Sequence, residues 1–226
     1  MGGNGANSHK VSGSANPTGS SVYMNATEST ILNTTKIGES LNKEGFLSSL
    51  SKAEKQAVND YSENAYNSVN RYLRSSRDLK SITPKNKKTM NTLSKVLDKH
   101  TLTQNVITHR GASLDSILGE DMSIGYIKKH PESLQELKGA IIKDKGFMST
   151  TLNKKIASGG DGISGDVLFN IKAPKGTKAT FIQSLSSYKE ESELLFQKGS
   201  SMKVDNISFD KKTGKVIVSA SMIKSK

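Results

Sequence analysis

Two glutamates, Glu191 and Glu193, stand two residues apart in the segment YKEESELLF (188–196), where an apolar run predicts a strand. Alternate residues of a strand face the same side of a sheet, so the spacing predicts that both carboxylates share one face. Neighbouring carboxylates repel each other, which costs free energy unless water screens them or chemistry uses them. The pair is therefore either an exposed strand edge or a catalytic pair, and these residues alone leave both interpretations open.

Two other polar groups lie at the ends of expected strands. Arg110, in THRG, is the only arginine after residue 77, and its planar fork suits either a phosphate or a structural ion pair. Ser149, Thr150 and Thr151 follow in GFMSTTL, where hydroxyl groups either satisfy backbone groups or support a site.

The composition excludes several classes of site. The 226 residues include no cysteine, which rules out disulfides, a thiol nucleophile and cysteine-ligated metals. The four histidines show no metal-ligand spacing, so we expect no metal. The net charge is +12, but only four of the 33 basic residues are arginine and aromatic residues make up 5%. This balance favours a solvated lysine-rich surface over a nucleic-acid interface.

The N-terminal half is predicted to be helical after a loose start. Residues 1–25 are rich in Gly, Ser and Asn and are expected to form a disordered leader, with a single domain over 26–226. This start lacks the basic-then-apolar pattern of a secretory signal, and no apolar run approaches the length of a membrane span. A 3.6-residue apolar period predicts a helix over 51–73, begun by a capping box of Ser51 and Glu54. Further helices are predicted at 84–100, 113–119 and 130–142, and residues 28–39 are ambiguous between a loop and a short helix.

The C-terminal half has the pattern of strands. Short runs of β-branched and aromatic residues alternate with Gly, Pro, Asn and Asp after Gly146, and one earlier run lies at 106–111. A hairpin turn is expected at 210–215. Helices followed by strands predict an α+β fold. The later strands are expected at 145–152, 166–174, 178–183, 192–197, 201–210 and 215–223.

Taken in order, the Arg, the Ser-Thr-Ser-like segment and the Glu-x-Glu pair resemble the bacterial mono-ADP-ribosyltransferase toxins over about residues 45–223. The sequence is most similar to the enzymatic component of clostridial actin-modifying binary toxins and to single-domain C3-like exoenzymes. The resemblance implies an ADP-ribosyltransferase fold, with N-terminal helices followed by two packed antiparallel sheets around an NAD cleft. It also implies that NAD is split at the nicotinamide–ribose bond and that ADP-ribose passes to a target protein, without a metal.

The same resemblance implies catalytic roles for three residues. Glu193 would stabilise the positive charge that develops on the ribose, and Ser149 would hold its carboxylate. Glu191 would orient or deprotonate the acceptor, and a Glu at this place implies that the acceptor is an arginine.

Binding roles follow in the same way. Arg110 would hold an NAD phosphate, and Gly111 would let its backbone approach the nicotinamide. Tyr66 and Asn70, one helical turn apart, match NAD-contacting positions, although one packed and one solvated residue would give the same pattern. Tyr188 matches a target-recognising aromatic position or is an exposed loop residue.

Two features depart from the family pattern. The segment NKKIASGGDGISG (153–165) lacks the aromatic residue and the arginine that clamp NAD in relatives, and Lys154 or Lys155 are candidates to supply the charge. His109 stands where relatives often carry a second arginine and is a candidate phosphate contact.

The resemblance leaves target and delivery open. We expect a monomer that modifies an arginine of a target protein, with actin as a candidate and a bacterial target as another. The protein is expected to be secreted or delivered into a target cell, or to act inside bacteria if it is phage-encoded. An NAD glycohydrolase with the same site and a nonenzymatic basic binding module are the alternatives.

Overall fold

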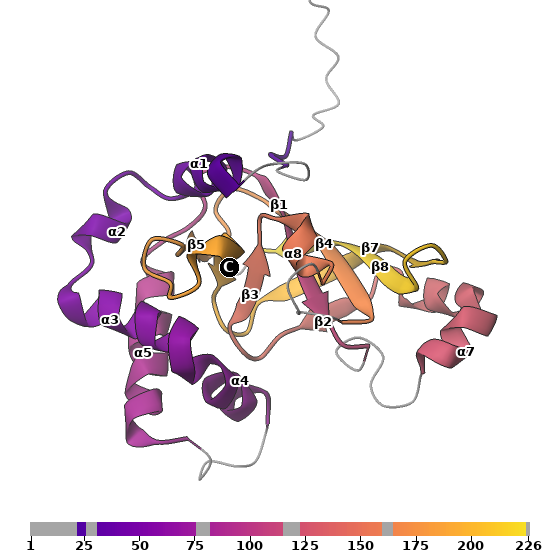
Figure 1. Cartoon of the computed structure of the whole chain (residues 1–226), viewed down its shortest axis with the longest axis horizontal. Helices are drawn as coiled ribbons and strands as arrows, with labels where there is room; N and C mark the ends of the chain where they lie inside the picture. Colours follow the sequence, from indigo (N-terminus) through magenta and orange to yellow (C-terminus); the bar gives the residue numbers. More distant parts are fainter. Residues whose placement is uncertain (1–21, 26–30, 76–81, 115–122, 160–164, 225–226) are drawn as a thin grey trace, which may run out of the picture.

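The computed structural model describes residues 22–25, 31–75, 82–114, 123–159 and 165–224, and it confirms the α+β prediction. The helices of the N-terminal half gather on one side of a sheet, and α7 lies near its other end (Figure 1). The helices are α1 (Ile31–Leu41), α2 (Phe46–Ser49), α3 (Lys52–Asp60), α4 (Tyr66–Arg74), α5 (Pro84–Asp98), α7 (Ile124–Lys129) and α8 (Lys154–Ala157). None of the helices in these ranges is long and apolar enough to cross a membrane.

The predicted helix over 51–73 is present but is not uniform. It begins with the expected capping box, in which the Ser51 and Glu54 side chains each bond the other's backbone amide. Between α3 and α4 the chain makes a five-residue π-helical segment, η1 (Tyr61–Ala65), so the helix is locally wider than the α repeat. The segment faces the cleft described below.

Eight strands form one hydrogen-bonded sheet in the order β2-β7-β8-β4-β1-β3-β6-β5. The pairing of β4 with β8 is parallel and the other described pairings are antiparallel. The strands are β1 (Val106–Ala112), β2 (Ile141–Lys143), β3 (Met148–Thr151), β4 (Val167–Ala173), β5 (Ala179–Phe181), β6 (Glu193–Phe196), β7 (Ser201–Asp210) and β8 (Lys215–Ile223).

This topology corrects the expectation of two antiparallel sheets. β1 and β3 share a single residue pair, His109 with Thr151, so the sheet nearly divides there into a five-strand and a three-strand part. Two apolar cores pack against the sheet. The larger core extends under both parts and includes Phe181, Leu194 and Phe196, and the other joins α3, α4 and α5 to Phe147 and Leu195.

Three other expectations are corrected or fall outside the described residues. Residues 22–25 are paired rather than disordered, because the Met24 backbone bridges to Val106. The helix expected over 130–142 is a 3-10 helix, η4 (Pro131–Leu137), followed by the edge strand β2. Most of the helix expected at 113–119, and residues 1–21 of the leader, lie outside the described residues.

Candidate functional site

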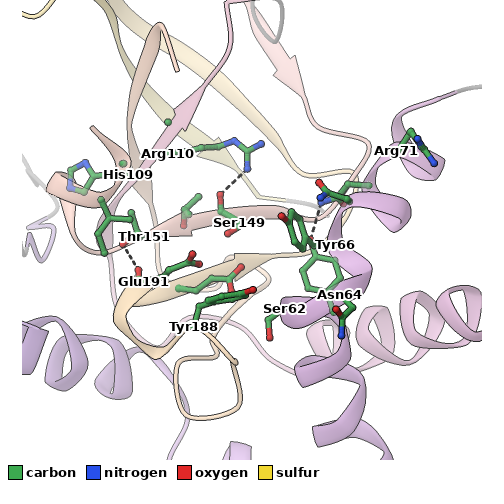
Figure 2. A pocket seen from close by; sticks show the side chains of 18 of the residues that line it. Ser62, Asn64, Tyr66, Arg71, His109, Arg110, Ser149, Thr151, Tyr188 and Glu191 are labelled. Atoms are coloured by element: carbon green, nitrogen blue, oxygen red, sulfur yellow. Dashed lines mark hydrogen bonds between the residues drawn. The ribbon is translucent and has the colours of Figure 1, made fainter. Parts of the chain in front are cut away.

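A cleft of about 1050 Å³ lies between the helix of residues 61–74 and the narrow junction of the sheet. All eight residues proposed from the sequence line it, and Figure 2 shows side chains from β1, β3, the turn before β6 and the helix converging on it. These eight are Tyr66, Asn70, Arg110, Gly111, Ser149, Tyr188, Glu191 and Glu193.

Glu193 is the first residue of β6 and is 5% exposed. It pairs with Thr151 of the neighbouring strand β3, and its backbone oxygen accepts a hydrogen bond from the Ile182 amide. Burial raises the pKa of Glu193 to about 7, because a charged carboxylate is poorly solvated there; the hydrogen bond from the Ser149 side chain opposes this rise. The nearby Glu191 raises the pKa further and Arg110 lowers it. Ser149 and Glu193 both line the cleft, and the role of Ser149 in holding this carboxylate stays a prediction.

Glu191 reaches the cleft by a route that the sequence did not predict. It ends a short 3-10 helix, η5 (Lys189–Glu191), and the next residue, Ser192, has a left-handed backbone with φ 48° and ψ 50°. The two glutamates therefore do not lie on one face of one strand, and the strand argument for their pairing was wrong. They share the cleft because the turn at Ser192 redirects the chain between them. Burial, followed by the charge of Glu190, raises the pKa of Glu191.

The hydroxyls of the Ser-Thr-Thr segment connect three strands. The Thr108 hydroxyl lies 2.7 Å from that of Thr150, which donates to the backbone oxygen of Leu194 at 2.7 Å. The Thr151 hydroxyl donates to the backbone oxygen of Glu191 at 2.5 Å (Figure 2). Thr150 and Thr151 thus support the fold around the carboxylates, as expected from the sequence, while Ser149 faces the cleft.

Arg110 bridges the gap where β1 and β3 separate. Its Nη1 donates to the backbone oxygen of Ser149 at 2.8 Å (Figure 2), and its Nη2 lies 4.0 Å from Asp144 Oδ2. Asp144 also accepts a two-point pair from Arg74, with distances of 2.9 and 2.8 Å. Burial alone would raise the pKa of Asp144. The hydrogen bonds and charge of Arg74, together with the charge of Arg110, have the larger effect, so the pKa is lowered.

The arginines of α4 were missed in the sequence. Arg71 and Arg74 both line the cleft with Arg110, so every described arginine lies at this site. Their spacing offered a signal, because Asn70 and Arg74 are one helical turn apart and share a face. Arg71 and Arg74 of α4 therefore add positive charge to the cleft, whereas Ile156 and Ala157 of α8 are the described residues of the segment after β3 that line it.

Asn70 is held by the protein on both sides of its amide. Its Nδ2 donates to the Tyr61 hydroxyl at 2.9 Å, and its Oδ1 accepts from the backbone of Phe147 at 2.9 Å. Tyr61 is buried, its ring meets Phe147 edge-on, and burial raises its pKa above the ordinary value of 10. Tyr66, in contrast, is 44% exposed at the rim. The pattern of one packed and one solvated residue is thus present, and both still line the cleft.

His109 is not a cation in this site. It is 1% exposed, its Nδ1 lies 2.9 Å from Asn170 Oδ1, and burial lowers its pKa to about 4. A neutral imidazole offers no charge to a phosphate, which argues against the phosphate contact considered from the sequence. The described residues contain no cluster of three or more His, Asp or Glu suited to a metal ion.

Comparisons with known proteins agree with this geometry. The family model for ADP-ribosyltransferase exoenzymes matches residues 34–225, and no curated protein matches the chain. Plx2a, an ADP-ribosyltransferase toxin from Paenibacillus larvae, has a similar structure at 24% identity, with a TM-score of 0.73 over 86% of this chain and 96% of that chain. C3stau2 from S. aureus, solved with NAD, is 23% identical with a TM-score of 0.72 over 90% of this chain and 99% of that chain.

A third similar structure comes from a binary toxin. The ADP-ribosylating toxin BECa of C. perfringens, solved with NADH, is 22% identical with a TM-score of 0.71 over 89% of this chain and 50% of that chain. Identities this low establish a shared fold, and the fold inferred from the sequence is thereby confirmed.

Proposed function

The chain belongs to the ADP-ribosyltransferase exoenzyme family, and on that premise we propose that it splits NAD and transfers ADP-ribose to an arginine of a target protein. The observation that carries the proposal is the buried carboxylate of Glu193, which faces the same cleft as three arginines. A substrate with anionic phosphates and a ribose that becomes cationic needs both kinds of charge. We further propose that residues 26–226 act as one catalytic domain.

The shape and charge of the cleft fit a dinucleotide. Small-molecule sites commonly enclose about 300–1,000 Å³, and the volume of this cleft lies just above that range. Arg110 and Arg71 are the proposed phosphate contacts, and Arg74 is held by Asp144 beside them. The NAD and NADH in the structures of C3stau2 and BECa support the choice of NAD.

Glu193 would act on the bond between nicotinamide and ribose. As that bond breaks, nicotinamide leaves with the bonding electrons and positive charge grows on the ribose. A fixed carboxylate stabilises this charge more than it stabilises the uncharged ribose of intact NAD, and low solvent exposure strengthens the effect. Ser149 would keep the carboxylate oriented and, by lowering its pKa, favour the ionised form that the reaction needs.

Glu191 would serve the acceptor. Its raised pKa makes it a better base than an exposed glutamate, so it can take a proton from an arginine guanidinium while the guanidinium nitrogen bonds the ribose. Tyr188 is 42% exposed beside it and is placed to contact the target protein. Actin is a candidate target, because the sequence resembles the actin-modifying binary toxins.

Mass spectrometry of purified actin and of cell lysates, after incubation with NAD and the protein, tests this function. The expected result is an ADP-ribose adduct on an arginine that is absent with Glu193→Ala. Glu191→Gln should abolish the adduct while nicotinamide is still released, since only the acceptor step is lost. Nicotinamide release without an adduct in any lysate would favour an NAD glycohydrolase. Absence of both reactions would refute the proposal.

A further inference from the structure

Ser192, between the two glutamates, has an unusual backbone. It is the only residue other than glycine with a positive φ in the described part of the chain, and its side chain is completely buried. A left-handed backbone costs a residue with a Cβ atom free energy, so it persists only where surrounding contacts hold it. Strain of this kind at a candidate active site points to a functional constraint on the turn.

Two contacts hold the turn from β3. The Thr151 hydroxyl donates to the Glu191 backbone oxygen, and the Leu152 amide donates to the Ser192 backbone oxygen at 3.1 Å. These bonds fix the two peptide groups on either side of the Ser192 Cα atom. They do not engage the Ser192 side chain.

The third contact comes from the N-terminal helix. The hydroxyl oxygens of Thr34, in α1, and Ser192 lie 2.8 Å apart, and both residues are fully buried. The two residues are 158 positions apart in the sequence, so the contact depends on how α1 docks. A hydrogen bond between buried side chains is costly to leave unmade.

α1 is docked by contacts that do not involve Thr34, and it lies beside β5 (Figure 1). The Asn42 side chain accepts from the Phe181 amide at 3.0 Å and donates to the Phe181 oxygen at 2.8 Å, so it pairs with β5 like a further strand residue. Gly38, one turn after Thr34, packs so closely that a Cβ atom there would lie 2.3 Å from the Phe181 ring. The helix therefore stays in place when the Thr34 hydroxyl is removed.

We propose that Thr34 and Ser192 form a clamp that positions Glu191 for transfer to the acceptor. Glu193 is fixed independently, because it is a paired strand residue and its backbone oxygen is bonded by Ile182. Glu191 has no strand pairing and depends on the turn. Loss of the clamp should therefore impair the acceptor step and spare the splitting of NAD, an expectation that rests on the proposed function.

Four variants test the clamp. Thr34→Val keeps the shape but removes the hydroxyl, and Thr34→Ser keeps the hydroxyl. Ser192→Gly removes the other hydroxyl while relieving the left-handed backbone. Thr177→Val is the matched control, because Thr177 is also buried and loses a 2.7 Å bond, to the Pro174 oxygen, away from the cleft.

The expected result is a change in the ratio of protein transfer to NAD hydrolysis. Thr34→Val and Ser192→Gly should lower transfer about tenfold, because small misplacements of a catalytic group are costly, and should change hydrolysis by no more than about twofold. Ser192→Gly should lower transfer without a fall in Tm. Thr34→Ser should transfer at the wild-type rate, because it keeps the hydroxyl. Equal losses of both reactions, or the same change with Thr177→Val, would reduce Thr34 to a structural role and overturn the proposal.

A second measurement does not depend on activity. Thr34→Val should speed hydrogen exchange at the Leu152 amide, which bonds Ser192, relative to Thr177→Val. Unchanged exchange would overturn the clamp. A wild-type protein that neither hydrolyses NAD nor modifies a protein would refute the proposed function, and the exchange result would still decide whether the clamp exists.

Discussion

Replacing Glu193 with glutamine should stabilise the folded protein at alkaline pH, although it removes the proposed catalytic carboxylate. Folding raises the pKa of this group from its ordinary value of 4.5 to about 7. Between these two values the folded protein holds a proton that the unfolded chain has released. The free energy of unfolding therefore falls as the pH rises through this window, and the loss is complete above the folded pKa.

The size of the effect follows from the shift. Each unit of pKa corresponds to about 1.4 kcal/mol, so ionised Glu193 should lower the stability by about 3 kcal/mol above neutral pH. Glutamine cannot ionise and keeps a similar shape, so the variant escapes this loss. Between about pH 5 and pH 8, the stability of the variant relative to the wild type should rise by roughly 2–3 kcal/mol.

Denaturant unfolding of both proteins at the two pH values, without NAD, measures this change. In thermal unfolding the same difference corresponds to roughly 5–10 °C in Tm for a chain of this size. Any packing or hydrogen bonds lost with the substitution lower the free energy of unfolding equally at both pH values, so their contribution cancels in the comparison. A stability difference between variant and wild type that is the same at both pH values would show that burial does not raise this pKa.

Three further predictions concern the cleft and the N-terminal helix. In the wild type, kcat/KM for NAD should fall about tenfold for each pH unit below about pH 7, because Glu193 must be ionised. Ser149→Ala should move this fall to higher pH, because Ser149 lowers the pKa of Glu193. A pH profile that does not move would contradict the Ser149 contact. Arg71→Ala should raise KM for NAD about tenfold with little change in Tm, because one charged phosphate contact is lost, and an unchanged KM would place the phosphates elsewhere. Gly38→Ala should cost about 1–3 kcal/mol by forcing a Cβ atom against the neighbouring ring. Gly125→Ala, in α7, should not destabilise the fold, because the nearest atom to its Cβ would be the Ser123 hydroxyl oxygen at 3.7 Å, an ordinary van der Waals contact.

Local patterns in the sequence were sufficient for much of the fold and site. The capping box at Ser51 predicted the start of α3 because the interaction is complete within four residues. Arg110, the Ser-Thr-Thr segment and Glu193 lie at the ends of short apolar runs, so their convergence at one place on the sheet could be anticipated.

The remaining features depend on contacts that no local pattern encodes. The left-handed turn at Ser192 is stabilised by Thr34, far away in the chain, and the residue type gives no sign of it. The spacing of Arg74 from Asn70 indicates which helix face it occupies, but no local pattern shows that Asp144 lies beside it. The division of the sheet also depends on how β1 and β3 diverge after one pair, which alternation of apolar residues cannot reveal.

The π-helical segment η1 has a consequence for how this site could arise or be lost by mutation. A π-helical turn holds about one residue more than an α turn, so deleting one codon within Tyr61–Ala65 would return the segment to the α repeat and leave the faces of α3 and α4 nearly in register. The deletion would remove part of the wall that Tyr61, Ser62 and Asn64 form along the cleft, while both helices kept their packing. A single in-frame deletion would thus change the site without unfolding the helix, and a single-codon insertion is a route by which an ordinary helix could have gained this wall.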